Sequence, residues 1–140
     1  MEQIAKFERV TGYNDVILPK RATKGSAGYD FFAPEEVTLP CTIKTGVRVK
    51  INPGYVLCIF PRSGLGFKFG VKLANTVGVI DSDYYFAENE GHIIIKCEAN
   101  ENFVLKKGER FAQGIFLPFG ITIDDEAEGK RTGGFGSTGS

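Results

Sequence analysis

Apolar and polar side chains alternate over long stretches of this chain. Between residues 43 and 51, apolar or β-branched side chains at every second position are separated by Lys, Gly and Arg. A period of two residues is typical of a strand that buries one face and exposes the other. Further runs rich in β-branched and aromatic residues occupy positions 55–60, 91–97, 103–105 and 111–119. The pattern therefore predicts a succession of short strands.

Turn signals separate these runs, and helix signals are scarce. An Asn-Pro-Gly sequence at 52–54 and a Lys-Gly-Glu sequence at 107–109 are typical of turns between strands. Only residues 63–69 favour a short helix, and the two glycines in that segment weaken the prediction. Many short strands punctuated by Gly and Pro, without an internal repeat, predict an all-β protein with a jelly-roll-like barrel or sandwich.

The composition changes near Thr122. Residues 124–128 are mostly acidic, and residues 129–140 are almost free of aliphatic side chains. Such a segment cannot pack into a core, and we expect it to stay flexible until a ligand orders it. The sequence therefore predicts one β domain at residues 1–123 and a flexible arm at residues 124–140.

Length and charge narrow the class of protein. The chain has 140 residues, enough for one domain, and its 17 Lys and Arg balance 17 Asp and Glu. A net charge near zero argues against a nucleic-acid-binding surface. The sequence has no apolar run near the roughly 18 residues of a membrane-spanning helix, and no signal-peptide pattern at the N-terminus. We expect a soluble protein of the cytoplasm, or of the host cytoplasm if the source is viral, that binds neither membrane nor nucleic acid.

Cysteine and histidine are too few for a zinc site. Cys41, Cys58 and Cys97 show no Cys-x-x-Cys spacing, and His92 is the only histidine. Cys58 and Cys97 lie in apolar runs, so we expect them in the core as small apolar residues. No role is predicted for His92.

The glycine-rich C-terminal segment has the chemistry of a phosphate-binding loop. Its glycines expose backbone N–H groups, Ser137 and Thr138 add hydroxyls, and Arg131 adds a forked cation. Phe135 offers a flat surface for a nucleobase. The segment contains a formal G-x-G-x-x-G pattern, but a dinucleotide-binding loop must open a helix, and the sequence ends one residue later. A disordered Gly/Ser tail has the same composition.

Polar residues follow two of the apolar runs. Arg62, Ser63 and Gly64 combine a cation, a hydroxyl and a flexible backbone, which together can hold an anion. Asp81 and Asp83 follow the next apolar run, and a carboxylate held at a strand end can act as a general base on water.

Two more polar residues lie in turns of small residues. Asp30 suits a magnesium ion or its waters, because hard cations prefer carboxylate oxygen. Asn75 can hydrogen-bond the edge of a base or satisfy a bend of the chain. Taken alone, the segments at Arg62 and Asp81 are more often ordinary turns, and a turn or bend also explains Asp30 and Asn75.

Taken together, the order of these segments is specific. The segments are Ala27-Gly28-Tyr29-Asp30, Pro61-Arg62-Ser63-Gly64, Gly78-Val79-Ile80-Asp81 through Tyr84, Arg110-Phe111-Ala112-Gln113, and Arg131 through Gly139. In this order they resemble the five motifs of the trimeric dUTP pyrophosphatase (dUTPase) family. The resemblance covers roughly residues 4–139, and the third and fifth motifs are its most specific parts.

The resemblance implies a fold, an assembly and a reaction. The fold would be a jelly roll, and the protein a homotrimer with active sites at subunit interfaces. The C-terminal arm of one chain would close a site built by the others, as active-site lids do. The reaction would be hydrolysis of dUTP to dUMP and pyrophosphate by water attack on the α-phosphorus, with Mg²⁺ as cofactor. It would lower dUTP and supply dUMP for thymidylate synthesis.

The resemblance also implies a role for each matching residue. Asp81 would activate the attacking water, Asp30 would bind waters on the magnesium ion, and Tyr84 would stack on the deoxyribose and leave no room for a 2′-hydroxyl. The residues that would hold the phosphates are Arg62, Ser63, Gly64, Gln113, Arg131, Gly136, Ser137 and Thr138. The residues that would hold uracil are Asn75, the backbone of Gly78, Val79 and Ile80, and the ring of Phe135.

The sequence departs from the family pattern beside Tyr84. Phe86 stands where the family usually has Gly, and residues 87–90 resemble an insertion, so we expect an altered turn next to the sugar pocket. Gly66 stands where Ala is more usual.

Two other functions are compatible with the same fold. A dCTP deaminase would need a catalytic Glu in the third motif and would not be expected to end in this arm. A nucleotide-binding regulatory protein without activity is the other alternative, and the complete set of matching residues argues against it.

Overall fold

The structure, a computed structural model, describes residues 1–131. These residues form the following elements: β1 (Ala5–Arg9), β2 (Tyr29–Phe32), β3 (Val37–Leu39), β4 (Cys41–Lys44), β5 (Val47–Ile51), β6 (Tyr55–Pro61), α1 (Ser63–Phe69), β7 (Lys72–Leu73), β8 (Gly78–Ile80), the 3₁₀-helix η1 (Ser82–Phe86), β9 (Ile94–Glu98), β10 (Phe103–Leu105) and β11 (Arg110–Pro118). The prediction of an all-β protein is confirmed.

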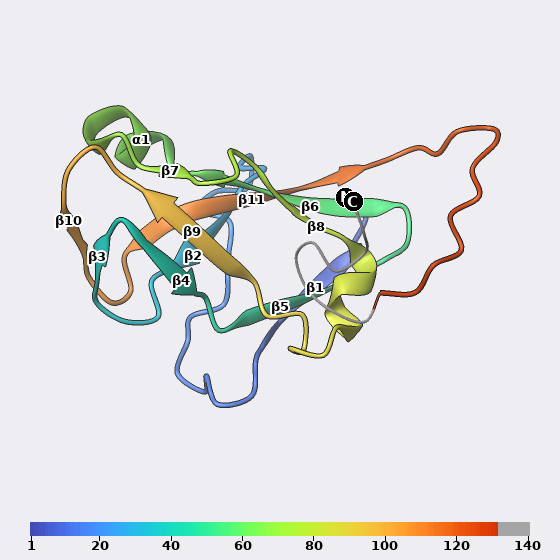
Figure 1. Cartoon of the computed structure of the whole chain (residues 1–140), viewed down its shortest axis with the longest axis horizontal. Coiled ribbons are helices and arrows are strands. Elements are labelled where there is room, and N and C mark those ends of the chain that lie inside the picture. Colours follow the sequence, from blue (N-terminus) through green and yellow to red (C-terminus); the bar gives the residue numbers. More distant parts are fainter. Residues whose placement is uncertain (132–140) are drawn as a thin grey trace.

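Antiparallel pairing joins segments that are far apart in the sequence. The largest sheet has the order β2-β11-β6-β8, and a three-stranded sheet has the order β4-β9-β7. Strand β1 pairs with β5, and β10 pairs with β3. Figure 1 shows β6 and β11 side by side along the molecule, with α1 near one end and η1, in yellow after β8, near the other. The four-stranded sheet therefore fixes where the predicted site residues lie.

The alternation between residues 43 and 51 predicted one strand, but the structure has two. Every second residue from Ile43 to Ile51 is buried, as the pattern requires. The chain breaks at Gly46, which has φ +76, so that β4 pairs with β9 while β5 pairs with β1. A side chain at Gly46 would come within 2.6 Å of the Tyr13 ring. The left-handed backbone and the close ring both require glycine here.

The core lies between the sheets. Its largest fully buried side chains include Phe31, Leu57 and Phe111, and burying a side chain of this size stabilises the fold by about 1.5–3 kcal/mol. Cys97 is 1% exposed, as predicted, and burial raises the pKa of its thiol to about 12. Cys58 is only half-buried, because it lies between the core residues of β6 on the outer face of the sheet. The expectation that Cys58 lies in the core was therefore wrong.

Most of the longer elements were predicted from the sequence, whereas most of the short ones were not. The helix predicted at 63–69 is α1, and the runs at 55–60, 91–97, 103–105 and 111–119 overlap β6, β9, β10 and β11. The sequence did not reveal η1 or the strands β1, β2, β3, β7 and β8, most of which are too short for a periodic pattern. Within residues 1–131, neither α1 nor η1 approaches the length and apolar character that crossing a membrane requires.

The chain leaves the sheet when β11 ends at Pro118. Every residue from Leu117 to Lys130 is exposed, and Arg131 is the first that is not. Figure 1 shows this segment looping away from β11 and returning beside η1. The end of β11 therefore lies before the boundary that the composition predicts after residue 123.

Candidate active site

One group of predicted site residues lies where β2, β11 and β6 end near α1. We call Asp30, Arg62, Ser63, Gly64 and Gln113 the α1 cluster. Gln113 on β11 stands directly opposite Asp30 on β2, so the two side chains share one face of the sheet. The Gln113 Nε2 donates to the Pro61 carbonyl at 3.4 Å, immediately before Arg62. The register of the sheet thus brings three of the predicted motifs together.

Two further contacts position side chains in the α1 cluster: Gly28 packs against Gln113, and Arg110 lies near Asp30. A side chain at Gly28 would come within 2.5 Å of the Gln113 Oε1, so the glycine of the first motif leaves room for the amide. Arg110 Nη1 lies 3.6 Å from Asp30 Oδ2, and the Asp30 side chain is 16% exposed. Among residues 1–131, no three His, Cys, Asp or Glu side chains gather as metal ligands. A magnesium ion at Asp30 would therefore take most of its oxygens from water and from a ligand.

The second group lies where β8 ends. We call Asp81, Asp83, Tyr84 and Arg131 the β8 cluster. Asp81 has an extended backbone, with φ −77 and ψ 156, and η1 begins directly after it. The side chains of Asp81 and Asp83 are 51% and 55% exposed. Both carboxylates are therefore accessible from solvent.

Strand β8 offers free main-chain groups next to these carboxylates. It lies at the edge of the four-stranded sheet, and within the described residues only β6 pairs with it. The other edge of β8 is therefore unpaired in this part of the chain, with Val79 exposed and Gly78 and Ile80 buried. Asn75 is exposed in the turn that leads into β8. A flat hydrogen-bonding group can lie along this edge beside Asn75.

Tyr84 is held tightly below the carboxylates. It is 3% exposed, its hydroxyl donates to the His92 carbonyl, and Asn89 Nδ2 donates to that hydroxyl at 2.9 Å. Gly91 has φ +69, and a side chain there would come within 2.6 Å of the Tyr84 carbonyl oxygen. The segment expected to be an insertion therefore wraps around Tyr84, and Gly91 provides the close approach beside it.

His92 is a structural residue that the sequence did not identify. Its Nε2 accepts the Gly46 N–H at 2.9 Å, and the Tyr13 ring meets the imidazole edge-on with centroids 4.9 Å apart. Burial, followed by the charge of Lys44, lowers the pKa of His92. No sequence signal could have found this role, because the partners come from separate loops.

Arg131 joins the arm to the β8 cluster of its own chain. Its Nη2 donates to Asp81 Oδ2 at 2.7 Å, and its Nε donates to Asp83 Oδ1 at 2.9 Å. The guanidinium carbon lies 5.9 Å from the centre of the Tyr84 ring. The other predicted residues of the fifth motif, Phe135, Gly136, Ser137 and Thr138, lie outside the described residues.

The two clusters stand far apart within one chain. Ile80 pairs with Leu57, which places Asp81 level with Val56. Pro61, the residue before Arg62 of the α1 cluster, ends the same strand, and the stretch from Val56 to Pro61 spans about 17 Å at about 3.4 Å per residue. Figure 1 shows the same separation between α1 and η1. One chain therefore does not bring Asp81 and Arg62 to one place.

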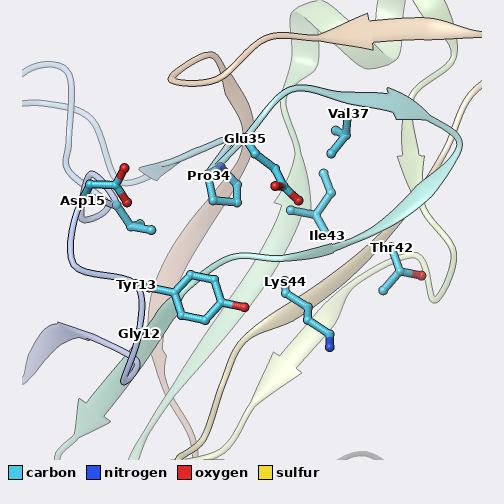
Figure 2. A pocket seen from close by; sticks show the side chains of 10 residues that line it. Gly12, Tyr13, Asp15, Pro34, Glu35, Val37, Thr42, Ile43 and Lys44 are labelled. Atoms are coloured by element: carbon cyan, nitrogen blue, oxygen red, sulfur yellow. The ribbon is translucent and has the colours of Figure 1, made fainter.

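The pocket of Figure 2 is separate from the predicted site residues. That pocket has a volume of about 420 Å³ and lies between the segments 12–16 and 34–37 and residues 42–44 of β4. Figure 2 shows Asp15, Glu35 and Lys44 placed around the Tyr13 ring. None of the predicted site residues lines this pocket, so the pocket does not mark the position of the candidate active site.

Comparison with known proteins identifies the family. The family model described as dUTPase matches residues 14–139, so this chain belongs to the dUTPase family. The deoxyuridine 5′-triphosphate nucleotidohydrolase of Lactococcus lactis is 44% identical, and the match covers 99% of both chains. The protein of the same name from Hahella chejuensis is 40% identical over 91% of this chain and 90% of its own.

Solved structures agree with this assignment. The crystal structure of dUTPase from Streptococcus mutans aligns with a TM-score of 0.76 at 42% identity, covering 85% of this chain and 98% of that chain. A mutant dUTPase of phage phi11 of S. aureus, whose structure reveals the coordination of a structural Mg(II) ion, aligns with a TM-score of 0.72 over 91% of this chain and 98% of its own. Its identity is 22%, so this likeness shows the fold alone. The all-β jelly-roll prediction is confirmed, with strands in four sheets of the described residues rather than one closed barrel.

Proposed function

We propose that the protein hydrolyses dUTP to dUMP and pyrophosphate by attack of water on the α-phosphorus. The observation that carries the proposal is the near full-length similarity to dUTP nucleotidohydrolases, combined with an accessible carboxylate, Asp81, at the end of an open edge strand. This is the arrangement that a general base on water requires, because the water must reach the carboxylate from solvent.

Asp81 orients the attacking water and takes its proton. A positioned general base contributes about 10²–10⁴-fold, equivalent to about 3–5 kcal/mol of the barrier. Its backbone is fixed between β8 and η1, so the carboxylate keeps its direction relative to a nucleotide that lies along β8. The remaining acceleration comes from positioning and charge stabilisation at the phosphates.

The open edge of β8 accounts for base selection. Main-chain donors and acceptors of Gly78, Val79 and Ile80, with the side chain of Asn75, offer a fixed pattern to the edge of uracil. A site built to hydrogen-bond one edge can reject a wrong one by about 10⁴–10⁵. Tyr84, locked by two hydrogen bonds and by Gly91, forms the wall against the sugar, which excludes a 2′-hydroxyl.

The α1 cluster suits the phosphates. Arg62 provides the bidentate cation, while Ser63, Gly64 and Gln113 provide neutral donors. Asp30 fits a magnesium ion that arrives with the nucleotide, because one carboxylate plus phosphate oxygens and waters is the usual environment of Mg²⁺. The bound ion supplies charge neutralisation on the triphosphate. The arm adds Arg131 and, by resemblance, Phe135, Gly136, Ser137 and Thr138.

The separation of the clusters supports a homotrimer with sites between subunits. Asp81 and Arg62 can meet on one nucleotide when they come from different copies. The outer face of the four-stranded sheet offers a surface for such contacts. It is apolar and partly exposed at Val56, Cys58, Phe60, Val79, Ile115 and Leu117. Apolar sheet faces of this kind are normally covered by another layer.

The test is pyrophosphate release from dUTP, dCTP, dTTP and UTP, with magnesium and then with a chelator. We expect rapid, magnesium-dependent release from dUTP alone. Release from none of the four nucleotides would favour the regulatory alternative. Deoxyuridine nucleotide and ammonia appearing from dCTP would favour the deaminase. The location in the cytoplasm stays a prediction.

A further inference from the structure

Arg131 differs from the residues that precede it in the described part of the arm, because its side chain makes ionic contacts. From Leu117 to Lys130 each residue is exposed, whereas the Arg131 side chain is 12% exposed. Its two nitrogens engage two different carboxylates at 2.7 and 2.9 Å. Charge-assisted bonds of this length are the strong kind. Arg131 is therefore the point where the described part of the arm is fastened.

The two carboxylates that bind Arg131, those of Asp81 and Asp83, lie at the start of η1, and we call this pair the Arg131 seat. Asp81 precedes this 3₁₀-helix and Asp83 lies in its first turn, so their carboxylates stand two residues apart on the surface. The planar guanidinium fork can bond both at once, with the Tyr84 ring 5.9 Å below it. A lysine could not reproduce the paired bonds.

This position conflicts with catalysis by Asp81. The guanidinium occupies Oδ2 of the carboxylate that would take a proton from water, and it lies over the ring that would face the sugar. Arg131 must therefore leave before a nucleotide is bound productively. In the proposed function, the Arg131 side chain instead contacts the phosphates of the bound nucleotide.

We infer that Asp83 is a positioning residue that holds Arg131 over Asp81 in the nucleotide-free protein, so that a nucleotide must displace the arm from this seat before the reaction. The inference rests on the proposed role of Asp81 as the base. Asp83 supplies one of the two ionic bonds without taking part in water activation. Removing its charge therefore weakens the seat and leaves the base in place.

The seat can be tested without any activity. Trypsin must draw the Arg131 side chain into its own binding pocket to cut the bond that follows, whereas the neighbouring Lys130 is exposed. We expect Asp83→Asn to raise the ratio of cleavage after Arg131 to cleavage after Lys130 by about 3- to 10-fold, the range for a partly buried ion pair. Salt should raise the ratio in the parent protein and have less effect in the variant.

Glu88→Gln is the matched control. It removes the same charge from an exposed position on the segment after η1, where the described residues give Glu88 no ion pair. We expect this variant to behave as the parent. An unchanged cleavage ratio in Asp83→Asn, or an equal rise in Glu88→Gln, would overturn the inference.

Kinetics with dUTP give the second readout. We expect Asp83→Asn to lower KM by about 3- to 10-fold with kcat within about twofold, because only the ground state loses a competing contact. A higher KM or a much lower kcat would mean that Asp83 supports the nucleotide complex, which contradicts the inference. If the parent does not hydrolyse dUTP, the proposed function fails, while the tryptic ratio still decides whether Asp83 holds Arg131.

Discussion

Asp81 stands where an edge strand gives way to a 3₁₀-helix, and this placement leaves its carboxylate at the surface. The sequence was sufficient to single out Asp81, because its motif combines residue type, order and spacing. Its partner Arg131 could not be predicted as such. An ion pair between residues so far apart in the chain depends on the path of the arm, which has no periodic pattern.

Substitution of Asp81 by Asn tests the base directly. Asn keeps the size of the side chain and cannot accept the proton, so we expect kcat to fall by about 10²–10⁴-fold. Binding of a non-hydrolysable dUTP analogue, measured by calorimetry, should persist. Asp15→Asn removes a carboxylate that pairs with Lys107 away from the site and should keep the parent rate. Parent-like turnover in Asp81→Asn would remove Asp81 from the mechanism.

His92 leads to a prediction on pH and stability. Burial lowers its folded-state pKa below the ordinary value of 6.5, so the unfolded chain binds the proton first. The contribution of neutral His92 to the free energy of unfolding is therefore fully present above about pH 6.5. It declines as the pH falls through 6.5 toward the pKa of His92 in the folded protein. Protonated Nε2 can no longer accept the Gly46 N–H, which is the structural reason for the loss.

Urea unfolding at pH 7.5, 6.5 and 5.5 measures this effect. Other groups can also make stability depend on pH, so the comparison is with His92→Gln, which keeps an amide acceptor and does not titrate. We expect the parent to lose more stability than His92→Gln between pH 7.5 and 5.5. Parallel pH profiles for the two proteins would assign the loss to other groups.

Strands and loops differ in how far the sequence predicts them. Long runs with a clear period, such as β6 and β11, were predictable because burial on one face dictates the pattern. Strands of two or three residues, such as β7 and β8, carry no period of their own and form because a neighbouring strand offers a partner. The break at Gly46 was hidden, since the alternation continues through it and only pairing reveals the turn.

The turn around Tyr84 gives a prediction at this scale. Gly91→Ala introduces a methyl group within 2.6 Å of the Tyr84 carbonyl oxygen at a position with φ +69. We expect a loss of about 1–3 kcal/mol in unfolding free energy and a higher KM for dUTP, because the sugar wall shifts. Gly54→Ala is the matched control, with φ +91 and no atom within 4 Å. In this control the unfolding free energy should fall only by the strain of a left-handed backbone at a non-glycine residue, and KM should not change. Equal effects of the two substitutions would mean that the contact with Tyr84 has no role.

In the folded chain, the motifs that contain Asp81 and Arg62 lie far apart. The five motifs follow one another along the chain, but the sheet register places Asp81 and Arg62 at opposite ends of β6. No local pattern contains that register, because it is set by pairing between β8 and β6. The resemblance implied sites between subunits, and the separation of about 17 Å gives an independent physical reason for them.

Mixed oligomers test this arrangement. Asp81→Asn and Arg62→Ala should each be inactive alone. When the two variants are refolded together in equal amounts, a site that takes Asp81 from one copy and Arg62 from another is intact in about a quarter of random combinations. We therefore expect about a quarter of the parent activity, measured as pyrophosphate release. A mixture of Asp81→Asn with the double variant that also carries Arg62→Ala has no intact combination and should stay inactive. Mass measurement confirms that the copies have mixed. If mixed oligomers form and no activity returns, both residues act from the same chain, and the arrangement of sites between subunits is wrong.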